Sequence, residues 1–345
     1  MTKLILALDT SCDETSAAVT SGERVLSNIV ASQVDLHREY GGVVPDIAKR
    51  AHQQLLVPVI DEALSQADVT LGEIEAIAVT IGPGLAIALE VGVAKAKELA
   101  KTYQKPLIAI DHMEGHLLSP FARNTDGKFG IAKPPGFPGI GLLVSGGHTE
   151  LVLMKDFGKY QLIGQTLDDA AGECFDKVAR ILGLEYPGGP IISELAQKGN
   201  PDAFDLPVPM KDSGDFNFSF SGLKTACLYQ KQELGEMDQK QIANFCAAFE
   251  KTMVEALLIK LIPACREFKP KMVLLGGGVV ANRRLQKEVK REMGRLGIPV
   301  YLPYETKLLT DNGAMIGVAA FFKTKRGEFI EDIDRLERIP DLSLG

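Results

Sequence analysis

The sequence contains the same pair of structural units twice. Residues 3–20 read as an apolar strand, a small polar turn and a returning strand, and residues 139–154 repeat that order. A second unit, in which a short apolar strand leads through a glycine turn into a helix, occurs at 75–103 and again from Lys271 onward. Turns of small and hydroxyl residues can hold phosphate through backbone amides. Two halves with the same order of elements predict a duplicated α/β fold with a nucleotide in the cleft between two lobes.

Two histidines follow a buried strand directly. The apolar run Pro106–Asp111 is typical of a short strand, and His112 and His116 come next, four residues apart. In a helix this spacing places the two imidazoles ~40° apart on one face, where they can bind one metal ion. Glu114 would lie roughly 200° from His112, and Met113 stands where zinc proteases need Glu. Surface or capping histidines are the alternative, but functional loops of α/β sheets collect at strand ends.

Carboxylates gather at two other places in the sequence. Asp9, Asp13 and Glu14 lie within six residues, in a turn that can hold phosphate or a metal or can be an ordinary polar turn. Thr310 and Asp311 precede the last helix, where either is well placed as its N-cap. The alternative for Asp311 is a third metal ligand, because two His and one carboxylate describe non-haem iron sites and some catalytic zinc sites.

The sequence also predicts the local structure around several other residues. His37 is expected in a loop and His52 on the solvent face of a helix. Asp168 is expected to cap a helix that runs to Leu182. The turn Gly82–Gly84 either aims a helix N-terminus at an anion or is a tight turn that needs Gly for its backbone geometry.

Composition limits the class of protein. The 345 residues carry a net charge of −7, unlike a free-standing nucleic-acid binder, which usually has a basic excess. No apolar run approaches the ~20 residues that span a bilayer. The first apolar run is too short for a signal sequence, so we expect a cytoplasmic protein with no membrane partner. The five cysteines are scattered, which predicts reduced thiols.

Three further segments have open interpretations. A loop at 124–138, rich in Gly, Pro and Lys, is expected near the change of domain. Residues 217–225 interleave aromatic, hydroxyl and basic side chains, which can contact nucleic acid, close over a ligand or belong to the core. The helix 283–295 has a basic face that is either solvated, the usual case, or in contact with phosphate or tRNA.

A set of short motifs follows one order along the chain. They are Asp13–Thr15, Gly41–Pro45, His112–His116, Val144–Thr149, Asp176, Tyr186–Pro190, Phe220–Lys224, Gly276–Asn282 and Thr310–Ala314. In this order they closely resemble the TsaD family, the tRNA threonylcarbamoyladenosine-forming transferases, formerly called O-sialoglycoprotein endopeptidases. The resemblance runs from about residue 4 to about residue 320. The His-Met-Glu-Gly-His and Thr-Asp-Asn-Gly-Ala motifs also separate the chain from kinases of the same fold and from inactive paralogues.

The resemblance implies a fold and an activity. The fold is the two-lobed actin-like ATPase (ASKHA) α/β fold with a nucleotide cleft between the lobes. Residues 1–110 would form the N-terminal lobe, completed by a C-terminal helix at 311–325, and residues 111–310 the C-terminal lobe with inserted helices. The activity is that of an acyltransferase, which passes the threonylcarbamoyl group of threonylcarbamoyl-adenylate to N6 of adenosine 37 in tRNAs reading codons that begin with A.

The resemblance also implies site residues and partners. One divalent metal, iron as the expected ion and zinc as the alternative, would be bound by His112, His116 and Asp311. The adenylate, or ATP or ADP, would be held at Leu143, Val144, Ser145, Gly146, Gly147, Asp176, Gly189, Ser193 and Asn282. Ser193 departs from the Asp of many members, and Asp9 from the common Glu. Partners would be tRNA, the inactive paralogue TsaB and the small ATPase TsaE.

The chemistry of the reaction adds one hypothesis. An acyl-adenylate is already activated, so the enzyme needs no covalent nucleophile and must orient two substrates and stabilise charge on the carbonyl oxygen. Asp13 and Glu14 are the candidate catalytic carboxylates that accept the proton of the attacking amine.

Three other classes compete with this interpretation. A small-molecule kinase of the same fold would use phosphate-binding hairpins but has no use for a His/His/Asp set. A metallopeptidase requires Glu immediately after the first His, where Met113 stands. A non-catalytic scaffold would not need the intact histidines. Fold alone does not decide among these classes.

Overall fold

The computed structural model describes residues 3–131 and 133–345, and the chain divides into two compact units. Unit 1 consists of the residues up to Pro134, the short segment Phe157–Lys159 and the C-terminal segment Leu302–Gly345. Unit 2 consists of Pro135–Asp156 and Tyr160–Tyr301. Unit 1 is therefore built from segments at both ends of the sequence.

The sheet of unit 1 has the order β3-β2-β1-β4-β5. Strand β1 pairs antiparallel with β2 and parallel with β4, and β4 pairs parallel with β5. The strands are β1 (Leu4–Asp9), β2 (Glu14–Ser21), β3 (Arg24–Ser32), β4 (Ala76–Gly82) and β5 (Leu107–Asp111). Both faces of the sheet are covered by helices, which explains why β4 is buried along its whole length.

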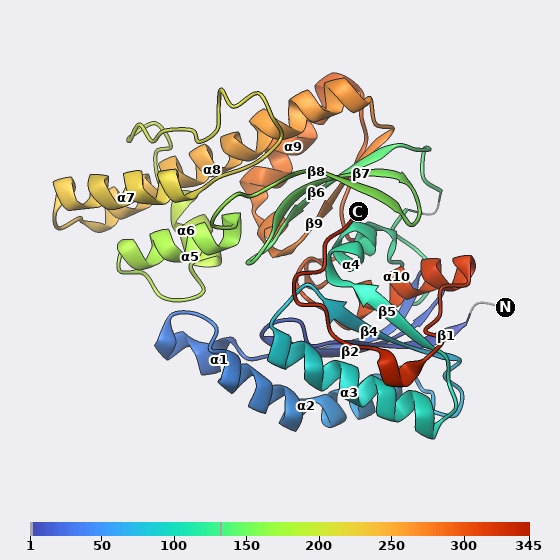
Figure 1. The fold of residues 1–345 in the computed structure, drawn as a ribbon. Helices are drawn as coiled ribbons and strands as arrows, with labels where there is room; N and C mark the ends of the chain where they lie inside the picture. Colours follow the sequence, from blue (N-terminus) through green and yellow to red (C-terminus); the bar gives the residue numbers. More distant parts are fainter. Residues whose placement is uncertain (1–2, 132) are drawn as a thin grey trace. The chain divides into compact units, whose positions relative to one another are not determined.

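Two helix layers cover this sheet (Figure 1). The long helices α2 (Pro45–Gln66) and α3 (Ala86–Thr102) pack against β2, β3 and β4, and α10 (Gly313–Arg326) packs against β1 and β2 and also contacts α4 (His112–Leu118). Leu6, Leu8 and Val79 belong to the core that includes Leu56 and Val59 of α2. The shorter helices of the unit are α1 (Val34–His37), η1 (Arg38–Tyr40), η2 (Ser119–Phe121), η4 (Thr306–Leu308) and η5 (Ile333–Arg335).

The segment after α10 returns along the sheet of unit 1. The amide of Ile330 donates to the carbonyl of Leu107 at 2.9 Å, and the amide of Ile339 donates to the carbonyl of Ile81 at 2.7 Å. The side chain of Lys97 on α3 donates to the carbonyl of Leu336 at 2.7 Å. The tail therefore takes part in the fold of unit 1.

The sheet of unit 2 repeats the arrangement of the first. Its order is β10-β9-β6-β7-β8, with β6 antiparallel to β7 and parallel to β9. The strands are β6 (Gly139–Val144), β7 (Thr149–Asp156), β8 (Lys159–Gln165), β9 (Met272–Gly276) and β10 (Val300–Tyr301). Read from β8 to β10, this order corresponds strand for strand to β3-β2-β1-β4-β5. The predicted duplicated α/β fold is confirmed.

The helices of unit 2 follow its strands in sequence. They are α5 (Ala171–Ile181), α6 (Gly188–Ala196), α7 (Ser221–Leu234), α8 (Gln239–Phe268), η3 (Gly278–Ala281) and α9 (Arg283–Leu296). Helix α6 packs on both α5 and α8. Among the described residues, every helix is too short or too polar to cross a membrane.

The predicted cap of α5 is wrong. The helix begins at Ala171 with Ala170 as its N-cap. Asp168 instead accepts hydrogen bonds from the amides of Phe220 at 2.7 Å and Ser221 at 3.2 Å, and so ties the start of α7 to the loop before α5. A short polar side chain three residues before the start of a helix can bind the backbone of a more distant segment, which sequence spacing does not reveal.

The structure shows where two segments with more than one interpretation lie, residues 217–225 and residues 124–138. Phe218 and Phe220 are 2% and 0% exposed, so the aromatic pair of residues 217–225 belongs to the core. The loop at 124–138 precedes β6 and contains the change from unit 1 to unit 2 after Pro134, and its residue 132 lies outside the described residues.

Candidate functional site

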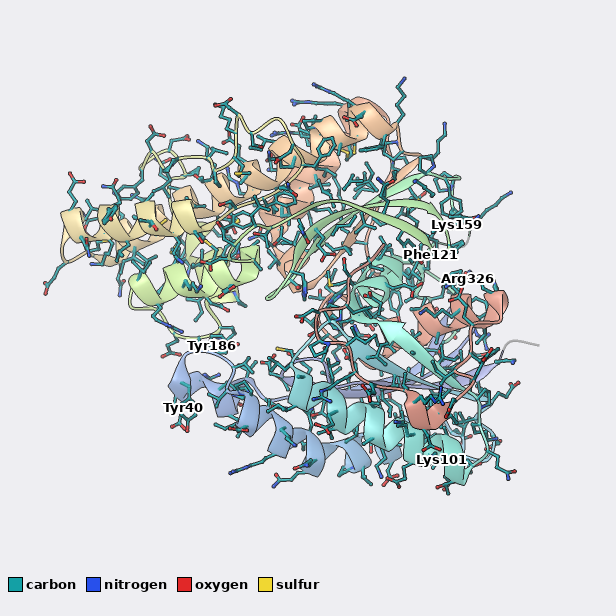
Figure 2. All side chains as sticks on the ribbon, viewed as in Figure 1. Tyr40, Lys101, Phe121, Lys159, Tyr186 and Arg326 are labelled. Carbon is teal, nitrogen blue, oxygen red and sulfur yellow. The ribbon has the colours of Figure 1, made fainter. Side chains whose placement is uncertain are left out.

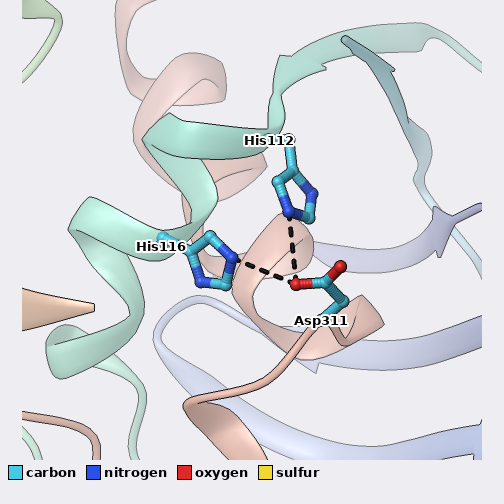
Figure 3. Close-up of side chains that lie close together, drawn as sticks. All are labelled: His112, His116 and Asp311. Atoms are coloured by element: carbon cyan, nitrogen blue, oxygen red, sulfur yellow. Dashed lines mark hydrogen bonds and ion pairs between the residues drawn. The ribbon is translucent and has the colours of Figure 1, made fainter. Parts of the chain in front are cut away.

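His112, His116 and Asp311 converge in unit 1, as Figure 3 shows. The Nε2 atom of His112 lies 3.3 Å from Asp311 Oδ1, and the Nε2 atom of His116 lies 3.1 Å from the same oxygen. The ligand atoms of the three residues lie within 4.8 Å of one another. Both imidazoles are buried. The histidine cluster, as we call these three residues, thus offers two nitrogens and one carboxylate oxygen, the donor set predicted from the sequence.

Two features place the histidines. Asp111 Oδ1 accepts hydrogen bonds from the amides of Met113 at 2.7 Å and Glu114 at 3.2 Å, and so caps α4 directly after β5. Gly115 lets α4 pack closely on α10, because a Cβ at this position would lie 3.0 Å from Ile316 Cδ1. The cap fixes where the helix starts, and the glycine brings its histidine face to the start of α10.

Asp311 is not the helix cap that the sequence suggested. Asn312 is the N-cap of α10, and its Oδ1 accepts a hydrogen bond from the amide of Met315 at 3.0 Å. The expectation that Thr310 or Asp311 caps this helix is wrong. Because Asn312 supplies the cap, the carboxylate of Asp311 faces the two imidazoles.

Buried polar atoms without partners surround the cluster. Within the described residues, His112 Nδ1, His116 Nδ1 and Asp9 Oδ2 are buried without a hydrogen-bond partner. Asp9 Oδ2 lies 3.4 Å from His112 Nδ1, a distance typical of an ion pair and long for a hydrogen bond. Buried polar atoms without partners are uncommon and often mark an ion or a functional site. The two Nε2 atoms and Asp311 Oδ1, which lie close together, suit a divalent metal bound by imidazole and carboxylate.

The charges in the cluster are coupled. Burial works against a charged His112, but the carboxylates of Asp311 and Asp9 outweigh it and raise the pKa of His112 well above its usual value. Burial lowers the pKa of His116. Burial also works against an ionised Asp311, yet the two histidines hold its pKa below the usual range. Metal binding therefore competes with a proton chiefly at His112.

Glu114 faces away from the histidine cluster. Its carboxylate is buried and lies 3.5 Å from both Lys323 Nζ and Arg326 Nη2 on α10. This agrees with the helical prediction that Glu114 and His112 lie on opposite sides of α4. Met113 is 1% exposed and belongs to the core. The zinc-protease arrangement, with a catalytic Glu after the first His, is absent from α4.

Asp13 and Glu14 lie at the turn between β1 and β2, next to the histidine cluster. Asp13 is 8% exposed. Burial, together with the carboxylates of Asp13 and Asp311, raises the pKa of Glu14 well above its usual value. Burial and nearby carboxylates also raise the pKa of the Cys12 thiol, so this cysteine is not a thiolate nucleophile at neutral pH. All five cysteines of the chain are free thiols, as predicted.

The expectation that His37 lies in a loop is wrong, because it is the last residue of α1. The expectation that His52 faces solvent is also wrong, because both histidine side chains are fully buried. His52 Nε2 lies 2.9 Å from the carbonyl oxygen of Cys12, and its Nδ1 lies 2.8 Å from Thr15 Oγ1. The spacing in the sequence could have indicated that His52 is buried, since it lies four residues after Ala48, which is on the buried face of α2. A histidine within an apolar stripe is easily taken for a residue at its edge.

The Gly82–Gly84 turn is a packing feature. The amide of Gly84 donates to the carbonyl of Pro340 at 3.1 Å, and the amide of Leu85 donates to the carbonyl of Ser11 at 2.8 Å. Gly84 has φ +155°, and a Cβ there would lie 2.5 Å from the carbonyl oxygen of Ser11. These contacts favour the tight-turn interpretation over an anion site at the start of α3.

The turn between β6 and β7 in unit 2 presents open backbone. Gly146 and Gly147 are exposed, and a Cβ built on either would meet nothing within 4 Å. The amide of Ser145 donates to the carbonyl of His148 at 2.8 Å, and the Ser145 hydroxyl accepts from the His148 amide at 3.1 Å. The amide of Gly172 at the start of α5 donates to the carbonyl of Ser145 at 3.2 Å. The turn is fixed at its base and leaves room above its two glycines.

Other residues assigned from the resemblance lie nearby in unit 2. The side chains of Leu143 and Val144 are fully buried in β6, so only their backbone is suited to a ligand. Asp176 on α5 accepts a hydrogen bond from the amide of Gly188 at 2.7 Å, which ties α5 to the start of α6. Gly189 follows in the first turn of α6.

Ser193 and Asn282 meet in a polar cluster with Glu250. Asn282 Oδ1 accepts from the amide of Leu285 at 2.9 Å and so caps α9. Asn282 Nδ2 donates to Ser193 Oγ at 2.8 Å and to Glu250 Oε1 at 2.6 Å. Burial raises the pKa of Glu250, although Asn282 opposes this. Glu250 lies inside a 30-residue helix without a surrounding motif, so sequence analysis missed it.

Part of the basic face of α9 is neutralised within the helix. Arg291 pairs with Glu288 at 2.5 Å and with Glu292 at 2.9 Å, and Arg295 pairs with Glu292 at 2.8 Å. This is the pattern of a solvated, ion-paired helix face.

Comparison with solved structures gives the fold class of the protein. The fold matches HypF in the phosphate- and nucleotide-bound form with a TM-score of 0.59 and 15% identity, over 94% of this chain and 55% of that one. It also matches the activator of 2-hydroxyisocaproyl-CoA dehydratase from Clostridium difficile with bound ADPNP, with a TM-score of 0.54 and 12% identity, over 94% and 96% of the two chains. The chain has the actin-like ATPase fold.

Sequence comparison identifies the family within this class. The family model described as TsaD, tRNA N6-adenosine threonylcarbamoyltransferase, matches residues 24–318. A protein of that name from Symbiobacterium thermophilum is 47% identical over 99% of this chain and 97% of its own length. One from Syntrophotalea carbinolica is 46% identical over 92% and 90%. The chain belongs to the tRNA N6-adenosine threonylcarbamoyltransferase family, a family of acyltransferases that modify tRNA.

Proposed function

We propose that this chain transfers the threonylcarbamoyl group of threonylcarbamoyl-adenylate to N6 of adenosine 37 in tRNAs that read codons beginning with A. Membership of the family supports tRNA threonylcarbamoylation. The observation that carries the finer proposal is the buried His112/His116/Asp311 cluster beside the carboxylates of the β1–β2 turn. A kinase acting on a small molecule would not need such a donor set.

We propose that His112, His116 and Asp311 hold one divalent ion, with iron as the expected metal and zinc as the alternative. Imidazole nitrogens and a carboxylate suit either metal. When bound, such an ion would supply Lewis-acid stabilisation of negative charge on the carbonyl oxygen under attack. The protein residues have to keep the cluster dry and its imidazoles oriented, which their burial and the Asp111 cap of α4 favour.

Asp13 and Glu14 are the proposed proton acceptors. The attacking nitrogen of adenosine loses a proton as its bond to the carbonyl carbon forms and the bond from that carbon to the phosphate oxygen breaks, which releases AMP. A nearby carboxylate can accept the proton. A general base is most effective when its pKa lies near the operating pH. The raised pKa of Glu14 moves this carboxyl in that direction, which makes it the stronger of the two candidates.

The adenylate is proposed to bind in unit 2. The exposed backbone at Gly146 and Gly147 can approach a phosphate or carbamoyl group without interference from side chains. The set proposed to contact it is Leu143, Val144, Ser145, Gly146, Gly147, Asp176, Gly189, Ser193 and Asn282. The hydrogen bond between Ser193 and Asn282 supports their acting as one polar surface.

We further propose that the protein works with partners. With a net charge of −7, the chain lacks the basic excess of a protein that binds nucleic acid alone. An inactive paralogue (TsaB) and a small ATPase (TsaE) are the proposed protein partners, and a cytoplasmic location is proposed because aminoacyl-tRNA metabolism and ATP are found there.

The direct test is incorporation of labelled threonine into unmodified tRNA. The mixture contains the adenylate-forming enzyme, ATP, bicarbonate and the two partner proteins, with this chain present, absent or carrying His116→Ala. Incorporation that requires the chain and its histidine supports both transfer and the metal centre. If His116→Ala leaves incorporation unchanged, the proposed transfer would stand, but the proposed role of the metal in it would be refuted. Phosphorylation of a metabolite without incorporation would replace the proposal with the kinase alternative.

A further inference from the structure

A continuous series of hydrogen bonds crosses the interior of unit 1. It begins at the backbone amide of Val44, just before α2, and ends at the carbonyl of Cys12 in the β1–β2 turn. In order, its members are Val44 N, His37 Nδ1 and Nε2, Gln33 Oε1 and Nε2, Thr15 Oγ1, His52 Nδ1 and Nε2, and Cys12 O. We call this series the His37–His52 relay. Its side chains lie between the candidate catalytic turn and the surface segment 38–44.

The two ends of the relay, together with the side-chain amide of Gln33, fix the direction of its bonds. The carbonyl of Cys12 can only accept, so the proton of His52 is on Nε2. The amide of Val44 can only donate, so His37 Nδ1 carries no proton. His37 Nε2 then donates to Gln33 Oε1, which turns the amide nitrogen of Gln33 toward Thr15. The same nitrogen of Gln33 lies 3.3 Å from His52 Nδ1 and is a donor, so this ring atom carries no proton. Both imidazoles are therefore neutral and protonated on Nε2.

The relay is buried throughout its side chains. His37, His52 and Thr15 are 0% exposed, and Gln33 is 1% exposed. Burial lowers the pKa of His52, which favours the neutral ring that the bond directions require. A second proton on His52, at Nδ1, would place an N–H donor against the side-chain N–H of Gln33, 3.3 Å away. Buried polar groups in a fully satisfied network specify one conformation of the backbone that they contact.

The backbone contacts of the relay fall on the turn that carries the candidate carboxylates. His52 holds the carbonyl of Cys12 at 2.9 Å, and the backbone amide of Gln33 holds the carbonyl of Asp13, also at 2.9 Å. Both carbonyls belong to the peptide units that present the side chains of Asp13 and Glu14. The side chains of the relay therefore lie behind this turn.

We propose that His52 and Gln33 are positioning residues for the transfer reaction, and that the His37–His52 relay sets the position of Asp13 and Glu14. The inference rests on the proposed function, because it assigns a purpose to the turn of the candidate proton acceptors. The bonds at His52 are 2.8 and 2.9 Å, whereas those at Gln33 and His37 are 3.3 Å. The effect of a substitution should therefore be larger at His52 than at His37.

The outer end of the relay lies at the surface. Tyr40, in the segment that connects His37 to Val44, is 55% exposed (Figure 2). A shift of this segment would change the hydrogen bond to His37 and, through Gln33, the hydrogen bonds of Thr15 and His52. The relay thus gives a surface segment a route to the candidate catalytic turn, because each bond in it has one permitted direction.

The first experiment tests the relay without measuring activity. Side-chain nitrogen spectra of the full chain labelled with 15N-histidine should show His37 and His52 as neutral rings protonated on Nε2 at pH 7.5. His52→Phe should shift the His37 signals and accelerate hydrogen exchange at the Gln33 amide. A charged ring, the Nδ1–H tautomer at either residue, or His37 signals that ignore His52→Phe would overturn the relay, whatever the protein catalyses.

The second experiment tests its purpose by threonine incorporation. His52→Phe should lower kcat by about ten- to a hundredfold, since a misplacement of ~1 Å can cost ~10²-fold, with the KM for the adenylate unchanged. His52→Gln, which keeps a donor for Cys12, should recover part of the loss. Val59→Ala is the matched control, because it weakens the packing of the same helix without touching the relay, and its kcat should stay at the wild-type value.

The outcomes separate the inference from the proposed function. A kcat loss in Val59→Ala equal to that in His52→Phe would reduce His52 to a structural residue and overturn the positioning role. An unchanged kcat in His52→Phe would do the same. If the wild-type chain transferred nothing, the proposed function would fail, while the nitrogen spectra and hydrogen exchange would still decide whether the relay exists.

Discussion

The turns β1–β2 and β6–β7 occupy equivalent places in two sheets of the same order, yet their chemistry is opposite. The turn in unit 1 carries Asp13 and Glu14 and is held by side chains buried behind it. The turn in unit 2 carries Gly146 and Gly147, which are exposed and have no chain atoms within 4 Å of a built Cβ. One turn presents carboxylates, and the other presents bare backbone.

The difference shows how equivalent turns of a duplicated fold can take different roles, one in catalysis and the other in substrate binding. A repeated strand–turn–strand unit fixes where a turn lies, whereas the residues in the turn decide what it can bind. Carboxylates beside the histidine cluster suit proton transfer and a cation, and glycines suit close approach by a phosphate. If this division is correct, substitutions in the first turn should act on catalysis and those in the second on substrate binding.

The largest effect is expected from loss of a metal ligand. His116→Ala should abolish stable binding of a divalent ion and lower threonine incorporation by about 10⁴-fold or more, because a Lewis-acid metal contributes several kcal/mol and each 1.4 kcal/mol is tenfold in rate. Metal content after dialysis and initial rates are the measurements. Met113→Leu, which changes a buried residue of the same helix without donor atoms for a hard cation, should keep both. Equal metal content in wild type and His116→Ala would refute the cluster as a metal centre.

The next effect concerns the first turn. Asp13→Asn and Glu14→Gln remove a carboxylate with little change in shape, and the variant that lacks the true proton acceptor should lose about 10²–10⁴-fold in kcat, as general bases typically contribute this much. The pH–rate profile of that variant should also lose its acidic limb. Normal turnover in both variants would exclude the turn from proton transfer.

A smaller effect is expected in the second turn. Gly146→Ala should leave thermal stability unchanged, because its Cβ meets no chain atom, but should raise the KM for the adenylate by about tenfold through the loss of ~1–2 kcal/mol of contact. Gly277→Ala is the opposite case, because Gly277 has φ +95° and a Cβ would lie 2.3 Å from the carbonyl oxygen of Val144. It should destabilise the fold by more than about 2 kcal/mol. A KM for Gly146→Ala equal to wild type would leave the open turn without a role in binding.

The smallest effect is on the pH dependence of stability. Burial lowers the pKa of His52 in the folded chain, so the unfolded chain takes up a proton below its pKa of ~6.5 before the folded chain does. The contribution of the neutral ring is therefore fully present above ~6.5 and is lost as the pH falls below that value. Urea unfolding at pH 7.5 and 5.5 should show a smaller loss for His52→Gln than for wild type, by at most ~1.4 kcal/mol per pH unit. Equal losses would indicate that folding does not lower the pKa of His52.

What the sequence predicted, and what it did not, follows from the range of the interactions. The pair His112 and His116 was predictable, because four-residue spacing on a helix after a strand is local information. The repeated sheet was predictable from the order of apolar runs and glycine turns. Asp311 lies 195 positions from His116, and only the resemblance to a family connected it to the histidines.

The errors arose where a side chain serves a distant partner. Asp168 was expected to cap its own helix but binds amides more than 50 positions away, and Asn312 caps the helix assigned to Asp311. His52 was missed because its partners, Cys12 and Thr15, come from another element. Local rules predict that a polar side chain forms hydrogen bonds with the nearest backbone in the sequence. In the tertiary structure its partner can instead be a distant segment.

The split of unit 1 between the two ends of the chain has a consequence for synthesis. A ribosome releases His112, His116 and all five strands of the first sheet well before residues 302–345, which include Asp311 and α10. At ~5–20 residues per second, the intervening stretch delays them by on the order of ten seconds. During that time α10 does not yet cover its apolar face of β1 and β2. This face is exposed, and a chaperone can bind it. The histidine cluster is then assembled late, because a nascent chain acquires it only after Asp311 has been made.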